Sequence, residues 1–162
     1  ISSFESGNLS LNWEPYFLEE VVGSAILRLE EVLKNHEIDL QLGKEQLIYI
    51  DGLLIEQVFI NLLENSAKYT KENAILQIHV EEQKDFVQVT LADNAQEIPQ
   101  DDMQYIFEKF YKWSQGGLGL PICRAIIEQH GGRMWAENNQ MGGVSFYFTL
   151  PKNKNTNNPI TH

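Results

Sequence analysis

The chain has 162 residues, of which 43% are hydrophobic and 10% aromatic, and this composition suits a single domain with a sizeable core. Its formal net charge of -11 disfavours contact with nucleic acid phosphates and anionic lipid, so any phosphate site must be local. The sequence has neither a run of roughly 20 apolar residues nor a signal-peptide pattern, so we expect a soluble chain without direct membrane contact.

The N-terminal part of the chain alternates strand and helix patterns. Residues 9–13 (LSLNW) alternate like a strand, and Pro15 then opens a helical pattern that continues to about His36. Two short strands follow, at 38–42 (IDLQL) and 47–51 (LIYID). They lead into a helix with an unusual polar face.

The rest of the chain predicts a strand pair, two helices and a closing hairpin. The single cysteine, Cys123, lies in an apolar run of the second helix, and we expect it to be a small buried hydrophobe. In chain order these elements are an antiparallel pair at 74–83 and 85–93 that turns at Lys84 and Asp85, a short helix at 103–111, a helix at 120–130 that stops at Gly131 and Gly132, and a hairpin from 133–138 and 143–151.

The order of the elements indicates an α/β (α+β) two-layer sandwich. Short connections favour antiparallel pairing of most strands, and the crossover helices are too few and too uneven for a doubly wound sheet. We therefore expect a mixed, mostly antiparallel sheet with helices packed on one face.

The helix at 56–70 (EQVFINLLENSAKYT) carries the polar face. At about 100° per residue, Asn61, Asn65 and Lys68 fall within an arc of roughly 60°. Asparagine is a poor helix former, so two of them one turn apart favour a function over a merely solvated face. Amide oxygens at this spacing can ligate Mg²⁺ or bind phosphates, and Lys68 adds a point charge. The apolar residues centre on the opposite side: Ile55, Phe59, Leu62 and Leu63.

Two other stretches can contact a nucleotide. Asp93 ends a strand at a turn, from which its carboxylate can accept a hydrogen bond from an exocyclic amine such as adenine N6. By itself, an Asp-Asn pair after a strand is more typical of an ordinary turn. Gly116, Gly117 and Gly119 precede a helix, so backbone N–H groups and the helix dipole can face an anion there, although a plain loop has the same pattern.

In this order, the stretches resemble the catalytic ATP-binding domain of sensor histidine kinases, in the GHKL superfamily with Hsp90, DNA gyrase and MutL. NLLENSAKYT looks like the N box, DNAQEIP the first glycine box and IFEKFY the F box. GLGLPICRAIIEQHGGRMWAEN and GGVSFYFTLP look like the second glycine box and the closing hairpin. The runs EEVVGSAILRLEEVL and DGLLIEQVFINLLENSAKYT are most similar to the KdpD subgroup of potassium- and turgor-responsive kinases.

The resemblance implies roles for the matching residues. In the ATPase relatives the position of Asn61 carries a glutamate that activates water, whereas an amide cannot act as a general base. Asn61 therefore favours transfer to a protein acceptor and argues against an ATPase clamp of the Hsp90 or MutL kind. The implied roles are Asn65 as the Mg²⁺ ligand, Asn61 and Lys68 as catalytic residues beside the phosphates, Tyr69 near the base and sugar, and Asp93 as the reader of adenine.

The lid of such domains lies between the F box and the second glycine box. Phe107 and Phe110 match the F box, whose apolar packing anchors the lid, although core packing alone explains them as well. Lys112 lies where a basic residue can reach the terminal phosphate, although an ordinary exposed lysine would look the same. The backbone of Gly117, Leu118 and Gly119 matches the part of the second glycine box that contacts ATP.

The glycine boxes depart from the family pattern at three positions. Ala95 and Glu97 replace both glycines of the first box, and Gln115 replaces the first glycine of the second. Ala adds strain where φ is positive, and Glu adds bulk and negative charge near phosphates. The lid is also short, either because it has contracted or because residues are absent. The alternative function is therefore a nucleotide-weak regulatory module of the same fold.

The phosphoacceptor histidine of this family has a sequence setting that His36, His79, His130 and His162 all lack. We expect His130 to be a cation in the last turn of its helix, where the dipole favours positive charge. The substrate histidine is then expected on another part of the parent protein, a dimerisation domain.

The resemblance thus implies a domain organisation and a set of partners. We expect a linker from the dimerisation domain at 1–8, the catalytic ATP-binding domain at 9–151 and a flexible tail at 152–162. Mg²⁺ and ATP would bind between the Asn-bearing helix and the Gly117–Gly119 loop. The expected protein partners are the dimerisation domain and a KdpE-like response regulator, and the expected location is the cytoplasmic side of an inner-membrane parent.

Overall fold

The computed structural model describes residues 10–69, 74–94, 97–108 and 119–152. Its elements in chain order are β1 (Glu14–Phe17), α2 (Leu18–Arg28), α3 (Glu30–Leu33), β2 (Glu37–Gln41), β3 (Leu47–Ile50), α4 (Gly52–Tyr69), β4 (Ile75–Glu82), β5 (Phe86–Asp93), the 3₁₀ helix η1 (Met103–Tyr105), α5 (Gly119–Gln129), β6 (Met134–Asn138) and β7 (Val144–Pro151).

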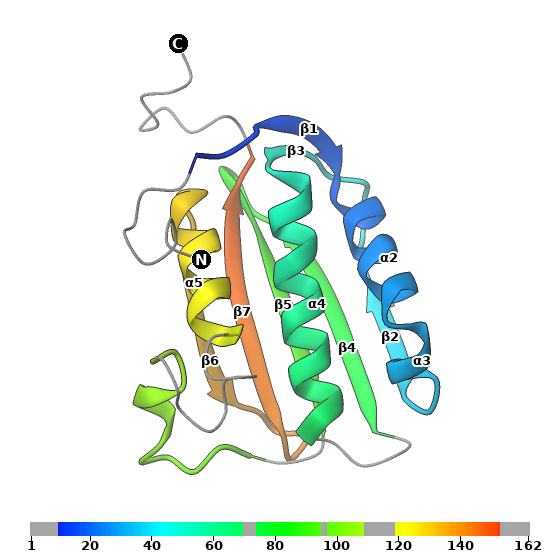
Figure 1. The fold of residues 1–162 in the computed structure, drawn as a ribbon, viewed down its shortest axis with the longest axis vertical. Coiled ribbons are helices and arrows are strands. Elements are labelled where there is room, and N and C mark those ends of the chain that lie inside the picture. The colour runs from blue at the N-terminus through cyan, green and yellow to red at the C-terminus, as the bar shows by residue number, and fades with distance from the viewer. Residues whose placement is uncertain (1–9, 70–73, 95–96, 109–118, 153–162) are drawn as a thin grey trace.

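These elements form two layers (Figure 1). A five-stranded sheet has the order β2-β4-β5-β7-β6, in which β2 pairs parallel to β4 and the other neighbours pair antiparallel. Helices α2, α4 and α5 lie on one face of this sheet, and a small β1–β3 sheet lies at one end. The predicted two-layer sandwich with a mixed, mostly antiparallel sheet is confirmed. In the described part of the chain, no helix combines the length and the apolar character needed to cross a membrane.

The N-terminal prediction is wrong in its boundaries. Pro15 lies inside β1, opposite Tyr49 of β3, and the following helix begins only at Leu18. A two-stranded sheet consists of edge strands alone, and an edge strand tolerates a residue without an N–H group. The helical pattern to His36 also breaks at Leu29, which has non-helical angles between α2 and α3.

The predicted helix at 103–111 is a three-residue 3₁₀ helix in the described residues. Its hydrogen bonds join residues three apart, as from the Tyr105 N–H to the Asp102 carbonyl, 2.8 Å away. The predicted strand at 9–13 is wrong, because residues 10–13 form no strand and β1 begins only at Glu14. The remaining predicted strands and helices are present, with ends within a few residues of the expected positions.

The core lies between the sheet and α4. The predicted apolar face of this helix is buried, and Phe59 packs edge-to-face against Phe148 of β7 with ring centroids 5.5 Å apart. The strands alternate, so that every second side chain of β4 and β5 points into the same core. The buried side chains of these two strands include Leu76, Ile78, Val80, Val87, Val89 and Leu91.

Asp51 fixes the start of α4. Its Oδ1 accepts a hydrogen bond from the Leu54 N–H at 3.2 Å, as an N-cap carboxylate does. Its Oδ2 accepts another from the Asn12 N–H at 2.9 Å, and its own N–H donates to Nε2 of His130 at 3.0 Å. One residue therefore joins the N-terminal segment, α4 and the end of α5.

His130 is neutral and buried, so its prediction as a helix-end cation is wrong. Because Nε2 accepts from Asp51, the proton lies on Nδ1, which donates to the Ile126 carbonyl at 2.8 Å. Trp13 packs edge-on against the imidazole, with ring centroids 5.1 Å apart. Burial lowers the pKa of His130, opposed by the Ile126 carbonyl and the charge of Asp51.

This cluster predicts a pH-dependent stability. Because the pKa of His130 is lower in the folded chain, the unfolded chain binds more protons below about pH 6.5. We expect the free energy of unfolding to fall as pH drops below that value, by at most about 1.4 kcal/mol per pH unit for this group. Urea unfolding between pH 5 and 7.5 measures the slope.

In the His130→Gln variant, the free energy of unfolding should no longer carry the histidine's contribution to its dependence on pH. The contribution of the carboxylates should remain. The matched control is His79→Gln, because His79 is exposed on the open face of the sheet and its removal leaves the cluster intact. A His130→Gln protein with the slope of the parent chain would contradict the assignment.

Candidate functional site

Three elements that carry predicted site residues meet at one end of the sandwich (Figure 1). The C-terminal turns of α4, the end of β5 and the start of α5 lie at this end, opposite the β1–β3 sheet. Asn65, Asp93 and Gly119 therefore share one region, although they come from three separate elements.

Burial changes along the polar row of α4. Asn61 is half-buried and accepts a hydrogen bond from Nε2 of Gln57 at 2.6 Å, whereas Lys68 is exposed in the last turn. Asn65 is only 5% exposed, and its buried Oδ1 accepts no hydrogen bond from any residue that the structure describes. An unpaired buried oxygen costs about 1–3 kcal/mol and calls for an explanation. A neutral, hard oxygen of this kind fits a Mg²⁺ ligand.

Asn61 lies where α4 faces α5. The thiol of Cys123 on α5 is fully buried and donates to the Val58 carbonyl at 3.8 Å. Burial raises the pKa of Cys123 to about 12, opposed by a hydrogen bond with the Asn61 side chain. The prediction that Cys123 is a small buried hydrophobe is confirmed.

Asp93 is the last residue of β5 and is 4% exposed. It follows the alternation of Val89 and Leu91, so its side chain lies on the face of the sheet that the helices cover. Its Oδ1 accepts a hydrogen bond from the Val144 N–H at 3.3 Å. A Cβ atom at Gly143 would overlap both the carbonyl and Oδ1 of Asp93, so the close approach of this turn requires glycine.

The chain that leaves Asp93 is held by a residue that the sequence analysis missed. The side chain of Asn138 accepts from the Ile98 N–H at 2.9 Å and donates to the Ile98 carbonyl at 2.8 Å. The amide thus bonds both backbone groups of Ile98, as a neighbouring strand would, and holds this residue beside β6. An asparagine at a strand end was the available signal, but its partner lies 40 residues away.

Phe107 packs against the sheet and α5, as either an F box or ordinary core packing would have it. Its ring lies edge-on to Phe146 of β7, with centroids 6.5 Å apart. The guanidinium carbon of Arg124 on α5 lies 5.0 Å from the centroid of the same ring. Phe107 thus joins the segment after Asp93 to the sheet and to α5.

Several predicted residues lie outside the described part of the chain. Tyr69 is the last residue of α4, but the structure does not describe its side chain. Gly119 is the first residue of α5, and Glu97 is exposed. The predicted residues outside the described ranges are Lys112, Gly117, Leu118, Phe110, Ala95 and Gln115.

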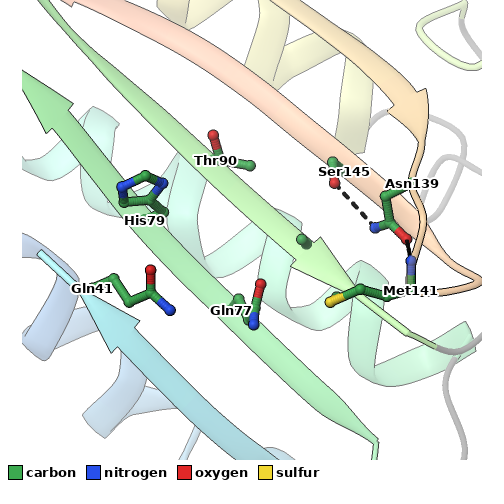
Figure 2. Close-up of a pocket in the computed structure, with 8 residues that line it drawn as sticks. Gln41, Gln77, His79, Thr90, Asn139, Met141 and Ser145 are labelled. Carbon is green, nitrogen blue, oxygen red and sulfur yellow. Dashed lines mark hydrogen bonds between the residues drawn. The ribbon is translucent and has the colours of Figure 1, made fainter.

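A pocket of about 190 Å³ lies on the opposite face of the sheet (Figure 2). Polar side chains of β2, β4, β5 and β7 form its floor, and the turn between β6 and β7 forms one wall. None of the predicted site residues lines it. The lining residues are Gln41, Gln77, His79, Thr90, Ala92, Asn139, Met141 and Ser145.

Residues 50–154 match the model of the histidine kinase-, DNA gyrase B- and HSP90-like ATPase family. The chain belongs to this family. It is 37% identical to the sensor protein KdpD of Clostridium acetobutylicum over 161 residues and 40% identical to KdpD of Escherichia coli over 159. Each match covers 94% of the chain but only 18% of the relative, so the chain spans about a fifth of the length of these proteins.

Solved structures of histidine kinases have the same fold. The nucleotide-free catalytic domain of ThkA superposes with a TM-score of 0.82 at 32% identity, covering 89% of this chain and 98% of that domain. A structure of ThkA with the response regulator TrrA gives a TM-score of 0.81 at 29% identity, covering 99% of this chain and 47% of that one. The predicted family, its GHKL fold and the similarity to KdpD are confirmed.

The contact between Gly143 and Asp93 predicts a large difference between two glycine substitutions. Gly143→Ala should lower the free energy of unfolding by about 1–3 kcal/mol, because the added methyl group overlaps Asp93. Gly23→Ala is the control, since Gly23 is exposed inside α2 with nothing within 4 Å of the added atom. It should raise stability by about 0.5–1 kcal/mol. Urea unfolding measures both, and two equal effects would contradict the proposed constraint on Gly143.

Proposed function

We propose that this chain is the ATP-binding catalytic domain of a sensor histidine kinase, which passes the γ-phosphoryl group of ATP to a histidine on a separate dimerisation domain. The observation that carries the proposal is the buried Oδ1 of Asn65, which has no hydrogen-bond partner among the described residues. This oxygen lies at the same end of the sandwich as Asp93 and the start of α5. The chain also belongs to a family of ATPases, which supports ATP as the ligand.

The residues at this end supply distinct contacts for the ATP complex with Mg²⁺. Asn65 holds the metal ion through its amide oxygen, and Mg²⁺ neutralises charge on the phosphates when bound. Lys68 and Asn61 face the phosphates, and Asp93 accepts a hydrogen bond from the adenine amine. Tyr69, Lys112 and the backbone of Gly117, Leu118 and Gly119 complete the proposed ATP site.

The chemistry of Asn61 favours phosphoryl transfer over hydrolysis. An amide does not take up a proton near neutral pH, so Asn61 cannot activate a water molecule as a general base. We place the acceptor histidine on the dimerisation domain, because His36, His79, His130 and His162 all lack the sequence setting of the family's phosphoacceptor. In addition, both nitrogens of His130 are engaged in the core. The proposed role of Asn61 is to position phosphate oxygens.

The wider assignments rest on the relatives. The KdpD proteins are named sensor proteins, and ThkA has been solved with a response regulator. By analogy, we assign residues 9–151 to the catalytic domain, 1–8 to a linker and 152–162 to a tail. The proposed partners are the dimerisation domain and a KdpE-like response regulator, on the cytoplasmic side of a membrane-anchored parent.

Asn65→Ala should abolish Mg²⁺-dependent ATP binding and leave the melting temperature close to that of the parent chain. The substitution removes the proposed metal-binding oxygen, which accepts no hydrogen bond from the described part of the fold. Calorimetric titration with a non-hydrolysable ATP analogue, with and without Mg²⁺, measures the binding. The control is Asn35→Ala, at an exposed asparagine after α3.

Two outcomes would redirect the assignment. An Asn65→Ala chain that binds the analogue as well as the parent would remove Asn65 from the site. A parent chain that shows no Mg²⁺-dependent binding would favour the alternative of a nucleotide-weak regulatory module, in which Ala95 and Glu97 obstruct the base and the phosphates. Glu97 is exposed beside this end of the fold, so its charge is available for that effect.

Asp93→Asn tests adenine recognition. The amide keeps an oxygen for the Val144 N–H but loses the charge that strengthens the bond to the adenine amine. Adenine nucleotides should bind more weakly by about 1.5–3 kcal/mol, the range for a hydrogen bond to a charged group. Inosine nucleotides lack this amine and should bind with nearly unchanged affinity. Equal losses for both nucleotides, measured by calorimetry, would exclude the adenine role.

A further inference from the structure

Asn139, in the turn between β6 and β7, bonds to the end of β5. Figure 2 shows its hydrogen bonds to Ser145 and Met141. The amide nitrogen of Asn139 donates to the Asp93 carbonyl and to Oγ of Ser145, each at 3.0 Å. Its Oδ1 accepts from the N–H groups of Met141 at 2.9 Å and Gly143 at 3.1 Å. A primary amide has two donors and an oxygen with two lone pairs, so Asn139 uses its full hydrogen-bonding capacity.

Asn139 contacts β5 just beyond the last residue pair that joins β5 to β7. That last pair is Ala92 and Ser145. Asp93, the next residue of β5, pairs with Leu76 of β4. The amide nitrogen of Asn139 donates to the Asp93 carbonyl and so extends the contact between β5 and the β6–β7 hairpin by one residue.

The same turn also orients the carboxylate of Asp93. The Val144 N–H donates to Oδ1 of Asp93, and the position of this N–H depends on the turn that Asn139 closes. The backbone N–H of Asn139 donates to the Gly143 carbonyl at 2.9 Å, which fixes the width of the turn. Asn139 therefore sets both the main chain of Asp93 and the donor that contacts its side chain.

We propose that Asn139 is a positioning residue for adenine recognition: it holds the Asp93 carboxylate in the orientation that accepts the adenine amine. This inference rests on the proposed function, in which Asp93 reads the base. Asn139 itself touches no nucleotide in this scheme. It acts from the open face of the sheet, where it forms part of the wall of the 190 Å³ pocket.

A positioning role predicts a change in preference between nucleotides. Without the amide, the Asp93 carboxylate remains but is no longer fixed toward the base. Affinity for the ATP analogue should then fall, while affinity for the inosine analogue, which lacks the amine, should change less. We expect the preference for adenine over inosine to drop roughly five- to tenfold, the loss of about one hydrogen bond.

The experiment compares two substitutions in the 162-residue chain. Asn139→Ala removes all four hydrogen bonds, whereas Asn139→Asp keeps an acceptor for the turn and loses both donors. The added charge of the Asp variant repels the identical triphosphate groups of both nucleotides equally, so this effect cancels in the ratio of affinities. Calorimetry with non-hydrolysable ATP and inosine triphosphate analogues and Mg²⁺ gives the ratio, and thermal unfolding records stability.

Two controls lie in the same hairpin. Met141 bonds to Asn139 through its backbone N–H, which Met141→Ala leaves in place. The preference for adenine over inosine should therefore stay at the parent value. Ser145→Ala removes the second acceptor of the amide without touching Asp93, and it should also keep the preference. A loss of preference in these controls as large as in the Asn139 variants would overturn the proposal, because any disturbance of the hairpin would then suffice.

The Asp93→Asn chain separates this inference from the proposed function. If Asp93→Asn lowers the adenine preference and the folded Asn139 variants do not, Asn139 has no positioning role and the function stands. If Asp93→Asn keeps the preference, the adenine role of Asp93 fails and the inference fails with it. If both Asn139 variants are unfolded, Asn139 serves the fold alone and the proposal is overturned.

Discussion

The hydrogen bond from the Asp51 N–H to the His130 imidazole sets the relation between the two helices that carry the site. Helix α4 begins one residue after Asp51 and carries Asn65 near its other end, whereas α5 begins at Gly119 and ends one residue before His130. The two helices are thus tied at the end far from the site. A buried neutral imidazole fixes this end, because each of its nitrogens has one partner and neither can change its protonation without losing one.

The asparagines at the end of the sandwich that holds the candidate site differ in their hydrogen-bond partners. Asn138 and Asn139 make paired hydrogen bonds that hold Ile98 and Asp93, as expected for amides that serve the fold. Asn65 is as deeply buried as Asp93, yet its oxygen lacks a partner within the described residues. This contrast with the neighbouring asparagines supports the proposed ligand role of the Asn65 oxygen.

The sequence predicted the parts of the fold that depend on local pattern. Alternation identified the strands of the five-stranded sheet, and the polar row of α4 was visible because asparagine is unfavourable in a helix. Pro15 misled the prediction, because its place in β1 depends on pairing with β3 more than 30 residues later. The neutral state of His130 depends on Asp51, 79 residues away in the sequence, and the hydrogen bond of Asn139 reaches Asp93, 46 residues away. No local sequence pattern predicts either contact.

The hydrogen bonds of Asn139 in the β6–β7 hairpin limit where the chain can change in length. Tips of surface hairpins usually accept inserted residues, because their backbone has few partners. This tip is closed by Asn139, and Gly143 lies directly against Asp93, so one added residue would carry the amide away from β5. Insertions, affinity tags and inserted domains should therefore be placed at the turn between β4 and β5, around Lys84, at the other end of the sheet from Asp93.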